Sequence, residues 1–167
     1  MTIAQIVRKM VNASRGNRHD IEHFMKVWAY AKTIGELEGL GEEEQATLEI
    51  AALVHDIACP LCREKYGSTD GKLQELEGGD LARAFLSDAA LPSQTVDRVA
   101  FLVSHHHTPK EADGMDYQIL LEADYLVNAD ESEYSPQNIR NAGNDLFRTQ
   151  AGRALLRSVY GFKDAAR

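Results

Sequence analysis

Four side chains that could ligate a metal occur at wide intervals along the chain: His23, the adjacent His55 and Asp56, and Asp124. Each lies among apolar residues or directly follows a run of them, so we expect all four in the interior. A buried carboxylate destabilises a fold unless it is hydrogen-bonded, paired with a cation or bound to a metal. Imidazole and carboxylate together suit divalent ions such as Zn, Mn or Fe. These residues therefore predict an interior cation site.

Apolar residues at helical spacing run through nearly the whole chain. They recur at steps of three and four residues, which is the pattern of a helix with one buried face. Alternating strand patterns and Asn-Gly hairpins do not occur in the sequence. We therefore predict an all-α fold, with helices over residues 3–11, 20–37, 42–54, 73–86, 93–103 and 117–127 and a final helical pair over 136–160.

The chain has 167 residues, a length that fits one domain. It contains neither an internal repeat nor a Pro-rich or Gly-rich linker. We therefore predict a single domain over residues 1–167, with a motif-bearing core over about 19–130. The C-terminal helices, residues 135–162, are expected to pack on this core.

The ordered set of candidate ligands resembles the HD-domain superfamily of metal-dependent phosphohydrolases. The resemblance rests on the motifs "IEHFMKVWAYA", "AALVHDIACP" and "ILLEADYLVN". It implies a compact helical bundle in which His23, His55, Asp56 and Asp124 hold a divalent metal. In that family the metal lowers the pKa of a bound water and holds a phosphate oxygen, so that hydroxide attacks phosphorus. Asp56 would also bridge to a second metal where one binds.

The motif "FLVSHHHTP" places three histidines at the end of an apolar helix. Family members with two metals resemble this, and the resemblance implies that His105 or His106 contacts a second metal or the substrate phosphate. We expect His107 to be solvated.

Two-metal members also tend to carry a histidine just before a glycine-containing helix. Here "KLQELEGGDLARAFL" offers Gln74, Glu75 and Glu77 but no histidine. A carboxylate from Glu75 or Glu77 could substitute for it. One metal is therefore predicted, and a second is left open.

The segment after His55 and Asp56 reads as an irregular connection around Pro60 and the stretch 67–71. Phosphate recognition requires cations near the metal, and this segment contains Arg63, Lys65 and Lys72. We predict that Lys72 neutralises charge on the phosphoryl oxygens, because it leads into the next helix.

The same segment holds a C-x-x-C pair, Cys59 and Cys62. No second pair completes a zinc ribbon, and no strand precedes it as in a thioredoxin-like site. A helix start or incidental thiols explains it better than a metal or redox role.

The composition excludes several classes of partner. The chain has 18 Lys and Arg against 26 Asp and Glu, a net charge of −8, which argues against binding a nucleic-acid backbone. No apolar run approaches the roughly 20 residues that a bilayer requires. We expect a cytoplasmic protein with reduced cysteines and a small phosphorylated substrate, and we leave a homodimer open.

The leading hypothesis is therefore a phosphohydrolase acting on a small phosphate ester, such as a nucleotide or related metabolite, with Asp56, Lys72 and His106 as catalytic candidates. Imidazole and carboxylate ligands do not select among Zn, Mn, Fe, Ni, Co and Mg. One alternative is an HD-type di-iron oxygenase. Another is a non-catalytic, metal-stabilised nucleotide sensor.

Overall fold

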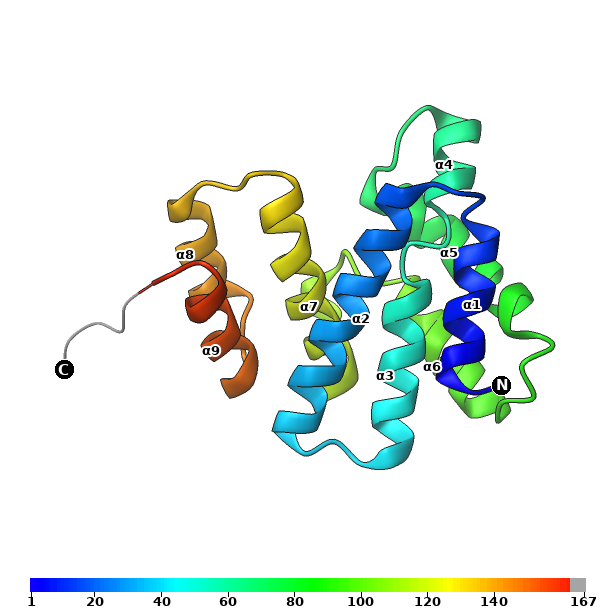
Figure 1. Ribbon diagram of the computed structural model, residues 1–167, viewed down its shortest axis with the longest axis horizontal. Coiled ribbons are helices and arrows are strands. Elements are labelled where there is room, and N and C mark those ends of the chain that lie inside the picture. The colour runs from blue at the N-terminus through cyan, green and yellow to red at the C-terminus, as the bar shows by residue number, and fades with distance from the viewer. Residues whose placement is uncertain (163–167) are drawn as a thin grey trace.

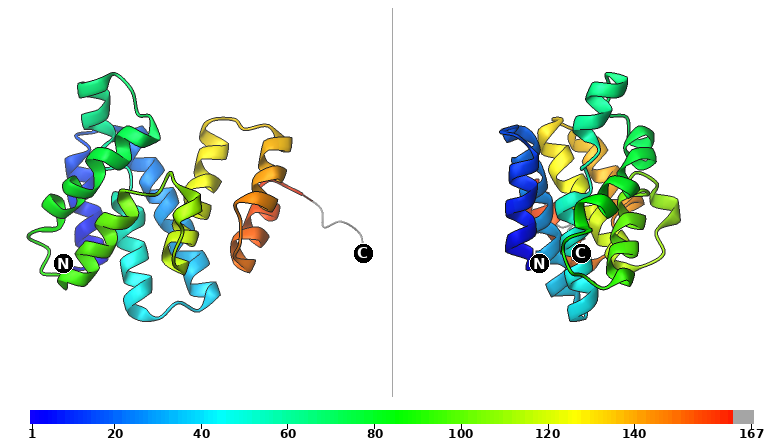
Figure 2. Two further views of the ribbon diagram at one scale, coloured as in Figure 1. Left: turned by 180° about the vertical axis from the view of Figure 1, so that it is seen from behind. Right: turned by 90° about the vertical axis from the view of Figure 1, so that its right-hand side faces the viewer.

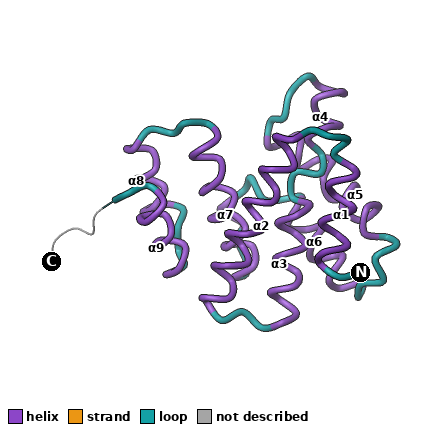
Figure 3. Tube along the Cα trace, in the orientation of Figure 1, coloured by secondary structure: helices purple, strands orange, loops and turns teal. Residues whose placement is uncertain are grey.

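The computed structural model describes residues 1–162, which form helices and connecting loops with no strand among them (Figure 3). The fold prediction is confirmed: the chain is all-α. The helices are α1 (Ile3–Ala13), α2 (Arg18–Glu38), α3 (Glu42–Val54), α4 (Cys59–Tyr66), α5 (Gly71–Leu86), α6 (Ser93–Val103), the short 3₁₀ helix η1 (Pro109–Glu111), α7 (Met115–Glu131), α8 (Pro136–Asp145) and α9 (Gln150–Val159).

Helices α2, α3 and α7 form the centre of the molecule and pack against one another (Figure 1). The second half of α3 is buried on all sides, from Thr47 to Val54. Most of α7 is also buried, so neither helix shows the one-sided pattern of a surface helix. Helices α1, α5 and α6 cover one side of this centre, while α8 and α9 lie on the other (Figure 2). A polar residue in the buried half of α3, or on the buried faces of α2 and α7, consequently lies against other helices rather than water.

One expectation about local structure was wrong. Residues 59–66 form the helix α4, in the segment that the sequence analysis treats as irregular. Pro60 fits because it occupies the first turn, where a backbone N–H has no partner inside a helix. Gly67 ends the helix with a positive φ of 66°. Only the stretch from there to Asp70, which caps α5, is irregular.

A buried carboxylate fastens the C-terminal helices to the centre. Glu122 of α7 is fully buried and accepts hydrogen bonds from Gln118 Nε2 (2.8 Å) and from the backbone N–H groups of Arg148 (2.6 Å) and Thr149 (2.9 Å). The Thr149 hydroxyl donates to the same carboxylate. Because α9 begins directly after these donors, the negative charge also lies at the positive end of its dipole.

None of the described helices combines the length and the apolar character needed to cross a membrane.

Gly152 of α9 leaves room for the Glu122 carboxylate at the start of α9. Substitution of Gly152 therefore tests how strongly Glu122 holds this helix. A Cβ at this position would collide with the Glu122 carboxylate, which its hydrogen bonds hold in place. We expect Gly152→Ala to lower the free energy of unfolding by about 1–3 kcal/mol in urea denaturation. In the control Gly41→Ala, nothing lies within 4 Å of the added Cβ, and the loss should stay below about 1 kcal/mol. Equal effects of the two substitutions would show that Glu122 does not constrain α9.

Candidate metal centre

The four predicted ligands come from the three inner helices. His23 lies in the second turn of α2, His55 directly follows α3, Asp56 is the next residue, and Asp124 lies in the middle of α7. All four side chains are at least partly withdrawn from solvent, and His55 is completely buried. Because α2, α3 and α7 pack on one another, the four side chains converge.

The distances between ligand atoms are short. His23 Nε2 lies 3.1 Å from His55 Nε2 and 3.3 Å from Asp124 Oδ1. His55 Nε2 lies 3.5 Å from the same Asp124 oxygen. The two carboxylate oxygens of Asp56 lie 3.5 Å from His23 Nε2 and from His55 Nε2, respectively. The fold thus brings all four predicted residues into one cluster.

The outer nitrogens of the two imidazoles are already occupied. His23 Nδ1 donates to Glu131 Oε2 at 2.8 Å, and His55 Nδ1 donates to the Ala52 carbonyl at 2.8 Å. Their Nε2 atoms therefore face each other with lone pairs unless one carries a proton. Two lone pairs 3.1 Å apart repel, so a proton or a metal cation must lie between them.

Two buried polar atoms at the cluster have no hydrogen bond with any described residue. They are Asp124 Oδ1 and His106 Nε2. His106 Nδ1 donates to the Val103 carbonyl, which turns Nε2 toward Asp56 Oδ1 at 3.3 Å. Unpartnered buried acceptors are rare because they forfeit a hydrogen bond to water. Asp124 Oδ1 lies beside the Nε2 atoms of His23 and His55, and His106 Nε2 lies beside Asp56, so each is placed to ligate a cation.

The charges of the site bias it toward binding a cation. Burial lowers the pKa of His23, but the close contact with Asp124 and the negative charges of Asp56 and Asp124 outweigh it and raise the pKa to about 9. Burial raises the pKa of Asp56, yet the neighbouring His55 and His106 bring it far below its usual range. Burial also raises the pKa of Asp124, but the adjacent imidazoles of His23 and His55 outweigh it and bring the pKa far below its usual range. In the metal-free chain, a proton on His23 thus takes the place of the cation.

Asp56 belongs to two groups of potential ligands. One ligand atom each from His23, His55 and Asp56 lie within 4.8 Å of one another, and the same holds for Asp56, His106 and His107. His107 is exposed, as expected, but one of its ring nitrogens also lies near Asp56 and His106, which was not expected. Burial of its inner edge and the neighbouring His106 lower its pKa to about 4, so the imidazole is neutral at pH 7, the form that binds metals. The second group therefore consists of three potential ligands, Asp56, His106 and His107.

His105 points away from this second group. Its ring stacks on Phe101, with ring centroids 4.2 Å apart, and its Nδ1 donates to the Phe101 carbonyl at 2.7 Å. Its Nε2 lies 3.7 Å from Glu111. Of the two histidines predicted at the second site, the structure brings only His106 to Asp56.

The two glutamates proposed as substitute ligands have other partners. Glu75 accepts hydrogen bonds from the His107 backbone N–H (3.0 Å) and from the Thr108 hydroxyl (2.9 Å), and so holds the histidine-bearing turn. Glu77 binds Lys65 at 2.6 Å on the surface. Neither glutamate is in a ligand group of the described residues.

Lys72 lies in the first turn of α5, next to the histidine turn. A Cβ on the adjacent Gly71 would be 2.6 Å from the His107 ring, so the two segments are in direct contact. Lys72 is exposed and forms no ion pair with a described residue. Arg63 and Lys65, the other cations of this segment, are paired with Asp20 and Glu77. Of these three cations, Lys72 is therefore the one whose charge is available to bind a ligand.

Cys59 and Cys62 lie close to the site, but their thiols are buried and unreactive. Both thiols are buried at the start of α4, and the Cys59 thiol donates to Gln74 Oε1 at 3.3 Å. Burial and the negative charge of Asp56 raise the pKa of Cys59 above its usual range, which keeps the thiol protonated. Gln74, at the place of the expected histidine, is occupied by this contact.

A narrow pocket of about 60 Å³ opens beside Asp56. Its walls are largely apolar and come from α1, α2 and the end of α3, including Met10, Phe24 and Leu53. Asp20, held by Arg63 Nη1 at 2.9 Å, lies at its polar edge. An organic group next to Asp56 would meet an apolar wall.

A family model for the HD domain matches residues 20–140, which is most of the chain and includes all four predicted ligands. The chain belongs to the HD-domain family. Members of this family are generally metal-dependent hydrolases, and the resemblance seen in the sequence is thereby confirmed at the level of the family. No curated protein matches the chain.

The HD fold also recurs in a solved structure. The crystal structure of a predicted HD superfamily hydrolase from an uncultured Thermotogales bacterium superposes with a TM-score of 0.69. The two sequences are 22% identical, and the match covers 95% of this chain and 85% of that one. At this identity the likeness establishes the fold alone.

Sequence reasoning missed one residue of this HD centre, Glu131. Its carboxylate lies 2.8 Å from His23 Nδ1 and 3.1 Å from Lys26 Nζ, so it orients the imidazole. Partners of this kind raise the basicity of a ligating histidine and fix its tautomer. A signal exists in the sequence: Glu131 follows Asp124 by seven residues, two helical turns, and so lies on the same face of α7.

Substitution of Glu131 tests this orienting role. We expect Glu131→Gln to weaken metal binding about 10- to 100-fold, as loss of such partners does elsewhere, with an unchanged helical circular dichroism spectrum. The control is Glu22→Gln, because Glu22 is exposed and pairs with Arg18, 3.6 Å away at the surface, rather than with a histidine of the cluster. If both variants bind Mn²⁺ as tightly as the parent chain, Glu131 does not orient His23.

The raised pKa of His23 predicts how metal affinity depends on pH. Below about pH 9 the metal-free chain keeps a proton on His23, and a metal must displace it. The association constant should therefore rise about tenfold per pH unit between about pH 6 and 8, with about one proton released per metal bound. Calorimetric titration in buffers of different ionisation enthalpy measures both quantities. A flat profile would show that His23 is not a ligand.

Proposed function

We propose that the chain is a metal-dependent phosphohydrolase that cleaves a small phosphate ester with an organic leaving group, such as a nucleotide or related metabolite. The main observation behind this proposal is that the ligand atoms of four side chains form one cluster: His23, His55, Asp56 and Asp124. Asp124 Oδ1 in this cluster has no hydrogen bond with a described residue. Membership of the HD-domain family supports the same class of chemistry.

The residues present fit a divalent metal, and His23, His55, Asp56 and Asp124 would hold it. When bound, such an ion supplies Lewis acidity, which lowers the pKa of a water and neutralises charge on a phosphoryl oxygen. Asp56 faces both ligand groups, so its carboxylate would align the two halves of the site. His106 and His107 lie where a substrate phosphate or a second metal would meet them. Zn, Mn, Fe, Ni, Co and Mg all remain candidates, since these ligand types do not select among them.

The surrounding residues suit an organic phosphate. Lys72 carries a positive charge beside the histidine turn, where it would attract the phosphate and stabilise charge on its oxygens. The apolar pocket beside Asp56 would accept part of the leaving group and exclude water from it. The overall charge of −8 does not prevent binding of an anionic substrate, because the nearby cations determine the electrostatic field at the phosphate.

The second ligand group is the observation that favours an alternative function, a di-iron oxygenase. Asp56, His106 and His107 could hold a second metal, as the proposed di-iron oxygenase requires, although Gln74 stands where a further histidine is expected. Two irons per chain and dioxygen consumption with an organic substrate would favour that alternative. Tight nucleotide binding without turnover, with each metal tried, would favour a sensor.

A phosphate-release screen over nucleotides and sugar phosphates with the metal found in the purified protein tests the proposal. We expect His55→Ala to lose both the metal and turnover while keeping its helical spectrum. Lys72→Ala should keep the metal and lower kcat/KM about tenfold or more, because it removes one charged contact to phosphate. The control Lys110→Ala, an exposed lysine without a described ion pair, should leave kcat/KM unchanged. Full phosphate release by His55→Ala would refute the proposal.

A further inference from the structure

The ligand cluster is most open to solvent on the side of Asp56. The Asp56 side chain is 29% exposed, whereas those of His23, His55 and Asp124 are 7%, 0% and 11% exposed. The narrow pocket of about 60 Å³ lies directly beside the Asp56 carboxylate. It is at the end of the molecule where the end of α1, the start of α2 and α4 meet (Figure 1). A substrate held at the cluster would therefore place its organic part next to this pocket.

The lining of the pocket is mostly apolar, and its polar groups already have partners. The apolar walls are formed by Met10, Ala13, Phe24, Leu53, Ile57 and Pro60. The Ser14 hydroxyl donates to the Met10 carbonyl at 2.9 Å, and both carboxylate oxygens of Asp20 accept from the Arg63 guanidinium. Among the described residues that line the pocket, no side chain is left to donate a hydrogen bond. A group rich in acceptors, such as a nucleobase, would lose its hydrogen bonds to water there without replacement.

The volume limits how much of a substrate the pocket can enclose. Sites that enclose a whole small molecule have volumes of about 300–1,000 Å³. Since an apolar cavity of about 150 Å³ holds one benzene molecule, a volume of about 60 Å³ corresponds to roughly two to four carbon atoms. The pocket therefore fits a short alkyl chain and excludes the ring of a nucleobase.

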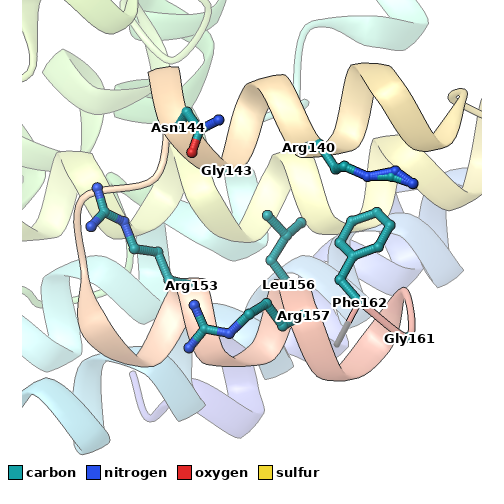
Figure 4. A pocket seen from close by; sticks show the side chains of 8 residues that line it. All are labelled: Arg140, Gly143, Asn144, Arg153, Leu156, Arg157, Gly161 and Phe162. Carbon is teal, nitrogen blue, oxygen red and sulfur yellow. The ribbon is translucent and has the colours of Figure 1, made fainter. Parts of the chain in front are cut away.

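The larger hollow between α8 and α9 does not offer an alternative site for the substrate. It has a volume of about 820 Å³, but none of the described residues that line it belongs to the ligand cluster. Figure 4 shows Arg140 and Arg153 at opposite ends of this hollow with their guanidinium groups pointing apart, so they do not converge on one anion. The pocket beside Asp56 is smaller, but it adjoins the residues that would hold the metal.

We propose that the pocket beside Asp56 receives the alcohol part of the substrate, so that the favoured substrates are phosphate monoesters of short aliphatic alcohols. This inference rests on the proposed hydrolase function and narrows its substrate class. In the reaction, water supplies the oxygen that joins phosphorus, the bond from phosphorus to the ester oxygen breaks, and the alcohol leaves with a proton from that water. Contact of the alkyl chain with Met10, Leu53 and Ile57 favours binding because it removes apolar surface from water.

Calorimetric titration of the Mn²⁺-loaded chain with n-alkylphosphonates, from methyl to hexyl, tests the pocket without requiring turnover. Hydrolysis of phosphate esters does not cleave their carbon–phosphorus bond, so the titration measures binding alone. We expect the association constant to rise about fourfold per added methylene over roughly the first two to four carbons and then to level off. An association constant that does not change with chain length would overturn the proposal.

Two substitutions on α1 alter the pocket without changing a candidate ligand. Ala13→Leu fills the pocket and should abolish the rise with chain length, while methylphosphonate binds as it does to the parent chain. Met10→Ala enlarges the pocket and should move the plateau to longer chains. The matched control is Ala4→Leu, at an exposed position of the same helix outside the pocket, and it should keep the parent profile. Circular dichroism checks that each variant is folded, and equal profiles for Ala13→Leu and Ala4→Leu would overturn the proposal.

Phosphate release with the same metal separates this inference from the proposed function. We expect kcat/KM for n-propyl phosphate to exceed that for adenosine monophosphate about tenfold or more, a preference that Ala13→Leu should remove. Release from nucleotides together with a flat phosphonate profile would overturn the role of the pocket and leave the hydrolase standing. A chain-length profile that Ala13→Leu abolishes, without phosphate release from any ester, would support the pocket and refute the hydrolase.

Discussion

The structure depends on how a buried group of acceptors is neutralised. His23, His55 and Asp124 place two imidazole nitrogens and a carboxylate oxygen within 3.1–3.5 Å of one another in the interior. Without a positive charge among them, their lone pairs would repel, and their desolvation would have no compensation. A proton on His23 or a metal ion supplies that charge. The packing of α2, α3 and α7 is therefore tied to the state of this one site, and metal binding and folding stability are linked.

Helix α7 connects this site to the rest of the molecule. Along one helix it carries Glu122, which holds the start of α9, then Asp124 at the metal cluster, and then Glu131, which orients His23. All three acids point into protein rather than water, and each has hydrogen-bond or charge partners that offset its burial. The same helix thus positions the ligand cluster and fixes the C-terminal pair of helices.

The sequence could predict the primary cluster because polar residues inside apolar helical stretches are rare and must be satisfied. His23, His55, Asp56 and Asp124 stand out for that reason, and helical periodicity places each on a buried face. Glu131 escaped the same reasoning because an acid near a helix end usually lies in water. Helix α4 was missed since it has only eight residues, contains a proline and bears no clear apolar stripe. The sequence could not predict which of His105, His106 and His107 faces the cluster. Three adjacent residues after a helix point in three directions, and the conformation of the turn decides which side chains face inward.

The sequence by itself determined the helical class, the family and the set of candidate ligands, since these follow from local periodicity and from residue types in apolar surroundings. Tertiary structure decided which atoms meet. It turned His106 and His107 toward Asp56 and His105 onto Phe101, and it gave Glu75 and Glu77 other partners. Among residues 1–162 it left Lys72 without an ion pair. Such contacts join residues far apart in the chain, so they depend on packing distances and side-chain directions that no local pattern encodes.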